Sequence, residues 1–236
     1  MNAWDVHATR RQIERSFDRA QLDLAAPCLR SLYDRDFYSR FHYQRACSTL
    51  RRYVKAHLDG TDPVPTIFGV DEPAWNRFNA AIRKVAADVT ACIQSIHAMP
   101  DILASAAYFS LALDRQYKPK HGHINHAFVR DSIKGRDDLR AVYSGLCAVT
   151  RGHDYKHLAA LANRSKHYSI VFPALSTDLT GKRSEQHLLV LPTFKVRSKI
   201  YPEVYLTEFL PPVHAQVSEA VVHTGHAILA CLKRAA

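Results

Sequence analysis

The chain contains 236 residues, of which 47% are hydrophobic and 23% charged, and its formal net charge is +10. This composition excludes a disordered or collagen-like chain and is sufficient for one large domain with an ordinary core. No apolar run approaches the roughly 18 residues that span a bilayer, and the first twenty residues are rich in charge, so we expect neither a transmembrane helix nor a signal peptide. The five cysteines are widely spaced without a CxxC pair, which favours reduced thiols in a cytoplasmic protein.

Hydrophobic periodicity predicts a series of helices along most of the chain. They cover residues 9–26, 35–58, 73–99, 101–114, about 126–134, 139–149, 154–167 and 213–234. Pro27 is expected to separate the first two, and Pro100 to mark a kink or a new first turn. Asp71 is the expected N-cap of the helix that starts near residue 73, and Asp137 or Asp138 caps the helix 139–149.

The period changes from helical to extended between residues 168 and 206. The segments rich in β-branched and aromatic residues are 168–173, 187–192 and 193–206. Residues 176–185 are predicted to form a hairpin connection, and the prolines in these segments indicate a small sheet with edge positions. The sequence therefore predicts a mainly α protein. We expect an antiparallel helical bundle of six to eight helices in a single domain 1–236, with an N-terminal helical extension 1–60 and a β insertion over about 168–206 before the last helix.

Positive charge is concentrated in one section of the chain. Residues 115–200 carry 16 basic and 6 acidic side chains, and the remainder of the chain is close to neutral. Half of the 14 histidines also fall in this section. Such a stretch can be the electrostatic footprint of a site for phosphate or nucleic acid. A solvated surface that keeps the protein in solution is the alternative interpretation.

Several histidines have spacings found in metal sites. These are His121, His123 and His126 in a predicted loop, and His153 and His157 four residues apart on a predicted helix. No carboxylate-rich third ligand lies near them in sequence, so we predict no metal site and no cofactor. The dipeptide His153-Asp154 is similar to one in metal-dependent phosphohydrolases, and that activity remains an alternative. The glycine-rich motifs of dinucleotide and P-loop sites and the hydrolase nucleophile elbow do not occur.

The predicted helix 154–167 gathers basic and amide side chains with little acid. On a helical wheel His157, Arg164 and His167 share one face, with His153 beside them and Asn163 four residues before His167. An arginine can bind the oxygens of a scissile phosphate, and a histidine can move the proton of the attacking or leaving oxygen. The alternative is a helix C-terminus with basic residues that the helix dipole favours.

Residues 163–167, Asn-Arg-Ser-Lys-His, resemble the N-x-x-K-H signature that ends a helix in bacterial proteins of the HEPN-like superfamily. Residues 95–113 resemble the long central helix of the same group, and the resemblance covers about residues 75–170 and the last helix. It implies a dimerising helical bundle that cleaves RNA without metal through an R-x4–6-H motif from each protomer. Members of the group often act in toxin–antitoxin or anti-phage systems. In this chain Ala162 occupies the position of the motif arginine, although Arg151 and His157 form an R-x5-H pair.

The resemblance implies a cytoplasmic homodimer that binds or cleaves RNA without metal or cofactor. In this hypothesis His167 is the acid/base, Arg164 binds the phosphate and Asn163 orients it. The further RNA- or phosphate-binding candidates are Lys166, His157, His153 and Arg151.

A second hypothesis is a non-catalytic HEPN-like interaction module or defence-cassette subunit that binds a partner protein through an apolar patch on the 168–206 sheet. The environment of Arg164 and His167 distinguishes the two. An accessible basic cleft around them favours cleavage. Packing against the β hairpin, with backbone carbonyls as partners, indicates a structural role.

Overall fold

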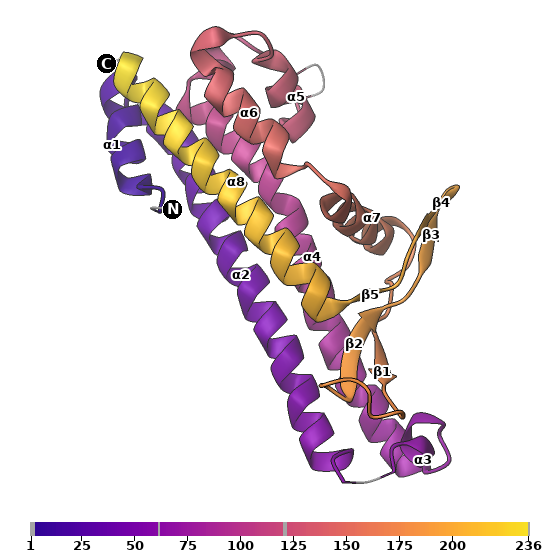
Figure 1. Cartoon of the computed structure of the whole chain (residues 1–236). Coiled ribbons are helices and arrows are strands. Elements are labelled where there is room, and N and C mark those ends of the chain that lie inside the picture. Colours follow the sequence, from indigo (N-terminus) through magenta and orange to yellow (C-terminus); the bar gives the residue numbers. More distant parts are fainter. Residues whose placement is uncertain (1–2, 61, 120–121, 236) are drawn as a thin grey trace. The chain divides into compact units, whose positions relative to one another are not determined.

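The computed structural model describes residues 3–60, 62–119 and 122–235 (Figure 1). Its α-helices are α1 (Val6–Ser16), α2 (Arg19–His57), α3 (Val64–Ile67), α4 (Glu72–Ser110), α5 (His126–Ser132), α6 (Arg140–Val149), α7 (His153–His167) and α8 (Leu206–Ala235). Its strands are β1 (Ala174–Thr177), β2 (His187–Leu191), β3 (Phe194–Val196), β4 (Lys199–Tyr201) and β5 (Val204–Tyr205). The predicted fold class, mainly α with a small antiparallel sheet before the final helix, is confirmed. Among the described residues, no helix has a stretch apolar enough to cross a bilayer.

The chain divides into two compact units. Unit 1 comprises Met1–Phe37, Ile96–Lys156 and Val213–Ala236, and unit 2 comprises Tyr38–Ser95 and His157–Pro212. The division falls inside the helices α2, α4, α7 and α8 and not in a linker, so each of these helices contributes one part to each unit.

In unit 1, the break between the first two helices lies at residues 17–18, and the prediction that Pro27 separates them is wrong. The Asp18 carboxylate accepts the backbone N–H of Gln21 at 2.7 Å and so caps the start of α2. Pro27 lies inside α2, and the buried face of the helix continues on both sides of it, through Leu22 and Leu29. Burial of each such side chain stabilises the fold by roughly 1.5–3 kcal/mol. The sum over these side chains outweighs the loss of the one backbone hydrogen bond that proline removes.

The N-terminal cap of α4 follows the prediction, and that of α6 does not. The Asp71 carboxylate accepts the backbone N–H of Ala74 at 3.0 Å. The helix then continues through Pro100 to residue 110. Asp137 and Asp138 instead form a short 3₁₀ turn (Asp137–Leu139), and α6 begins at Arg140 without a side-chain cap.

In unit 2, the strand predicted over residues 168–173 does not form, and β1 begins at Ala174. The sheet has the order β1-β2-β5, and Ala174 faces Val190 in the β1–β2 register. Continued towards the N-terminus, this antiparallel register would place Pro173 opposite Leu191 and Phe172 opposite Pro192. Both prolines lack an N–H, so the ladder cannot extend. Residues 168–173 therefore lead into β1 without belonging to it.

The last helix starts in unit 2 at Leu206, seven residues before the predicted start at residue 213, and Pro211 and Pro212 lie inside it. Leu206 and Leu210 are buried there, which provides a reason to extend the helix. The two prolines leave the carbonyls of Thr207 and Glu208 without helical donors. Both of these residues are exposed, so water can replace the missing N–H groups.

Candidate functional site

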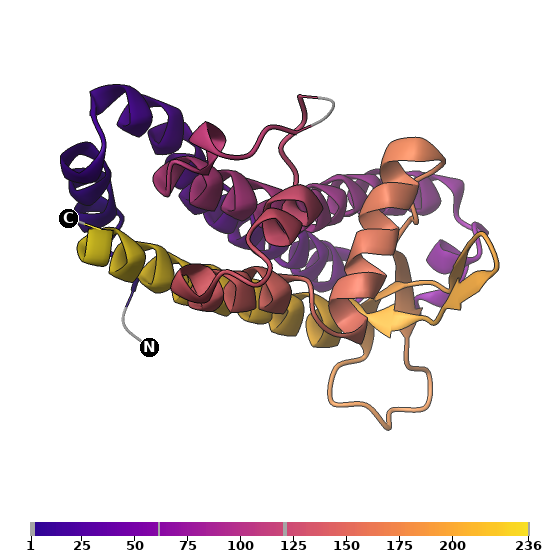
Figure 2. The same ribbon diagram turned by 90° about the horizontal axis from the view of Figure 1, so that it is seen from above.

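The part of α7 from His157 onwards belongs to unit 2 and packs against the β3–β4 hairpin, which extends beside it in the view from above (Figure 2). His157 is only 1% exposed. Its ring lies 5.4 Å from that of Phe194, 5.2 Å from that of Tyr201 and 4.9 Å from that of Phe209, measured between centroids. The imidazole is thus part of an aromatic core cluster, and a large anionic ligand cannot reach it.

Arg164 connects α7 to the same hairpin. Its Nη1 donates to the backbone oxygen of Lys195 in β3 at 2.6 Å. His157 and Arg164 do share one face of the helix, as the helical wheel predicts, but this face is packed and is not an open basic cleft. The guanidinium is engaged by a backbone carbonyl, which is the arrangement expected of a structural residue.

The other members of the 163–167 motif have a different environment. Asn163, Lys166 and His167 are exposed at the last turn of α7. Ser165 is half-buried, and its hydroxyl donates to the carbonyl of Ala162 at 2.8 Å. His167 follows Arg164 by three positions, a rotation of about 60° around the helix axis, and its side chain is exposed whereas that of His157 is buried.

Arg151 and His153, the remaining phosphate-binding candidates, belong to unit 1. Both are exposed. The carbonyl of Arg151 accepts a hydrogen bond from Nε2 of Gln216 at 2.6 Å, which ties the loop before α7 to α8. Nδ1 of His153 lies 3.6 Å from Oδ1 of Asp154.

The histidines with metal-like spacing do not converge within the described part of the chain. No group of three or more His, Cys, Asp or Glu side chains there is arranged to hold a metal ion. His126 is buried, and its Nε2 lies 2.6 Å from the carbonyl oxygen of Leu146. His153 is exposed whereas His157 is enclosed by aromatic rings, and His121 lies outside the described residues. The alternative of a phosphohydrolase centre at His153 and His157 gains no support from these positions.

Sequence reasoning missed the β3–β4 hairpin as a source of positive charge. Lys195, Arg197 and Lys199 are all exposed on it, and Arg197 occupies the turn with φ of 53°. Nζ of Lys199 lies 4.8 Å from the centroid of the Tyr201 ring. The signal in the sequence is three basic residues at every second position, which a two-residue turn gathers at the tip of a ribbon.

Exposed apolar side chains follow directly after α7. Tyr168 is 81% exposed, Ile170 52% and Phe172 47%. These alternate residues belong to the extended segment that the two prolines keep out of the sheet. Because the bond from Arg164 holds Lys195 beside the last turn of α7, the basic and aromatic groups belong to one region of unit 2. We call this region the basic–aromatic surface, and it comprises Lys166, His167, Tyr168, Ile170, Phe172, Lys195, Arg197 and Lys199.

Comparison of the chain with protein-family models, with curated proteins and with solved structures gave no match.

Proposed function

We propose that the protein binds single-stranded RNA through the basic–aromatic surface of unit 2. The observation that carries this proposal is the exposure of Tyr168, at 81%, directly after the basic residues Lys166 and His167. Proteins that bind single strands combine lysine and arginine contacts to phosphates with aromatic rings on which unpaired bases stack. The resemblance of residues 163–167 to the HEPN-like signature supports RNA as the nucleic acid.

The environment of the motif favours binding over cleavage. A metal-independent cleavage centre needs a guanidinium that can reach the scissile phosphate and a histidine beside it. Arg164 instead donates to the Lys195 carbonyl, and His157 is buried among aromatic rings. In the proposed complex Arg164 holds the hairpin in position, while Lys166 and His167 contact the backbone of the RNA.

Substitution of Tyr168 by alanine tests the proposal. Loss of one stacking platform weakens binding by about 1–3 kcal/mol, so we expect the Kd for a fluorescent 12-nucleotide oligouridine to rise about tenfold. Tyr168→Phe keeps the ring and should bind like the unchanged protein. Phe68→Ala removes another exposed aromatic side chain, 75% exposed and outside this surface, and serves as the matched control. Fluorescence anisotropy at low salt measures all four proteins.

Two results would overturn the proposal. One is an equal Kd for Tyr168→Ala and Phe68→Ala, or the absence of measurable binding. The other is cleavage of the oligonucleotide that persists in EDTA and disappears in His167→Ala, which would show that the surface is catalytic.

A second candidate function is a protein–protein contact, and the exposure of Ile170 and Phe172 favours it. Apolar side chains at alternate positions of an extended segment suit a partner protein or a second copy of the chain. Sedimentation velocity distinguishes the candidates. Self-association that Ile170→Asp abolishes, without RNA binding by either protein, would support the contact and count against the RNA proposal.

A further inference from the structure

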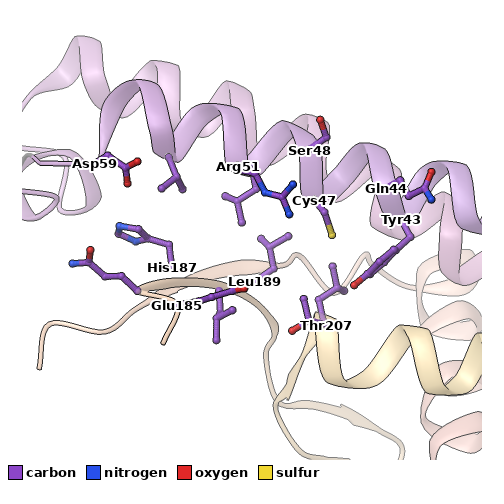
Figure 3. A pocket seen from close by; sticks show the side chains of 15 residues that line it. Tyr43, Gln44, Cys47, Ser48, Arg51, Asp59, Glu185, His187, Leu189 and Thr207 are labelled. Carbon is purple, nitrogen blue, oxygen red and sulfur yellow. The ribbon is translucent and has the colours of Figure 1, made fainter. Parts of the chain in front are cut away.

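Unit 2 contains a cavity of about 580 Å³ between α2 and β2, closed at one end by the start of α8 (Figure 3). Its apolar wall is formed by Leu50, Val54, Leu188, Leu189 and Leu206. None of these residues belongs to the basic–aromatic surface, so the cavity is a separate feature of the unit. Cavities of this size and lining are typical of sites for small ligands.

Three charged side chains line the cavity, namely Arg51 on α2, Asp59 just after α2 and Glu185 just before β2. Among the described residues, none of the three forms an ion pair within 4 Å. Burial raises the pKa of the Cys47 thiol, with Arg51 acting in the opposite direction and Glu185 in the same direction, so both charges are within electrostatic reach of the cavity wall. The positive and negative groups are thus available to a ligand that carries both charges.

Asp59 and His187 lie at one end of the cavity, and Arg51 lies nearer Tyr43 and Thr207 (Figure 3). Nδ1 of His187 lies 3.1 Å from Oγ1 of Thr177, while its Nε2 is buried and has no hydrogen-bond partner among the described residues. Burial lowers the pKa of His187, which favours the neutral ring. In the tautomer whose Nδ1–H donates to Thr177, Nε2 is an acceptor. Because this nitrogen is buried, the group that this end offers to a positively charged N–H donor is the Asp59 carboxylate.

We propose that the cavity binds a short peptide with free termini, about three residues long. Its ammonium group contacts Asp59, its carboxylate contacts Arg51, and its apolar side chains lie on the leucine and valine wall. Residue 51 and the end of α2 at residue 57 are about 9 Å apart along the helix, Asp59 follows two residues later, and three extended residues span roughly 10 Å. With two carboxylates and one guanidinium, the lining disfavours nucleotides and other polyanions.

Isothermal titration of the full chain with the tripeptide Ala-Leu-Ala tests the proposal. The probes are the free peptide, its N-acetyl form and its C-terminal amide. Arg51→Gln should weaken binding of the free peptide about tenfold and leave that of the amide unchanged, because the amide lacks the carboxylate. Asp59→Asn should weaken binding of the free peptide and leave that of the N-acetyl form unchanged. Arg52→Gln, at an exposed neighbouring position that does not line the cavity, is the matched control.

Methyl NMR of Val54 and Leu189 locates the bound peptide, and circular dichroism shows that each variant is folded. Saturable binding with shifts at both methyl groups and the crossed pattern of blocked peptides and variants would support the proposal. It would be overturned by the absence of heat and shift changes at 10 mM peptide, by equal effects of Arg51→Gln and Arg52→Gln, or by blocked peptides that bind as tightly as the free one.

Discussion

Asp88 is a buried carboxylate of unit 2 that joins α4 to α2. Nη2 of Arg45 lies 2.6 Å from its Oδ1, Nε of Arg45 2.8 Å from Oδ2, and Nδ1 of His42 2.8 Å from Oδ1. Burial raises the pKa of this carboxyl, but the hydrogen bonds from Arg45 and His42 outweigh burial and lower the pKa below its usual value. A carboxylate held in this way stabilises the folded state only while it is ionised.

We expect Asp88→Asn to reduce the free energy of unfolding by about 2 kcal/mol at pH 7, since hydrogen bonds to a charged group are lost. Because the folded pKa is lowered, the stabilisation is complete above the unfolded pKa of about 3.9 and declines as the pH falls towards the folded pKa. Urea unfolding of the unchanged protein and the variant, at pH 7 and below pH 4, measures this difference in the free energy of unfolding. Asp23→Asn, which breaks an exposed pair with Arg19, is the control and should change stability by less than about 0.5 kcal/mol. Equal effects of the two substitutions would contradict the stabilising role of the ionised Asp88.

At the scale of elements, periodicity in the sequence identifies most helices, since one buried face is sufficient to produce it. Where each helix ends depends also on groups that are distant in sequence. Pro173 and Pro192 exclude residues 168–172 from the sheet only because the continued β1–β2 register would place Pro173 opposite Leu191 and Pro192 opposite Phe172. Local β propensity in that segment is high, and it predicts a strand where the register forbids one.

The candidate site also depends on groups that are distant in sequence. The sequence correctly assembles basic residues at the end of α7, but a helical wheel does not show what covers each face. Arg164 has a structural role because β3, about thirty residues later, supplies the carbonyl of Lys195. The cavity beside His187 depends on packing between α2 and β2 and has no local motif. Both features arise from contacts between distant segments, which a single sequence does not record.

In unit 1, α6 and α8 approach each other closely at Gly145. A Cβ added there would lie 2.1 Å from Oγ1 of Thr224 and 3.0 Å from its Cβ. In an open helix, alanine is more favourable than glycine by about 1 kcal/mol. We expect the opposite here, with Gly145→Ala reducing the free energy of unfolding by about 1–3 kcal/mol. Thr224→Gly removes the obstructing side chain, so the double variant should lose less stability than the two single variants together, as measured by urea unfolding. A stabilising Gly145→Ala would disprove the close approach.

At the scale of the whole molecule, the net charge of +10 attracts any polyanion, so binding to RNA by itself does not identify a surface. The location of the charges can be tested with two variants that each remove three exposed basic side chains. One carries Lys195→Ala, Arg197→Ala and Lys199→Ala in the β3–β4 hairpin. The other carries Arg10→Ala, Arg11→Ala and Arg15→Ala on α1 of unit 1.

Binding to single strands releases about 0.7 counterion for each neutralised phosphate, so the slope of log Kobs against log salt reports the number of contacts. We expect the hairpin variant to reduce the magnitude of this slope by about 2, because three contacts are lost. The α1 variant has the same net charge as the hairpin variant, but it should keep the slope of the unchanged protein. Anisotropy titrations with the oligouridine between 50 and 200 mM salt measure both. An equal decrease in the two variants would mean that diffuse charge attracts the RNA, and would remove the hairpin from the proposed interface.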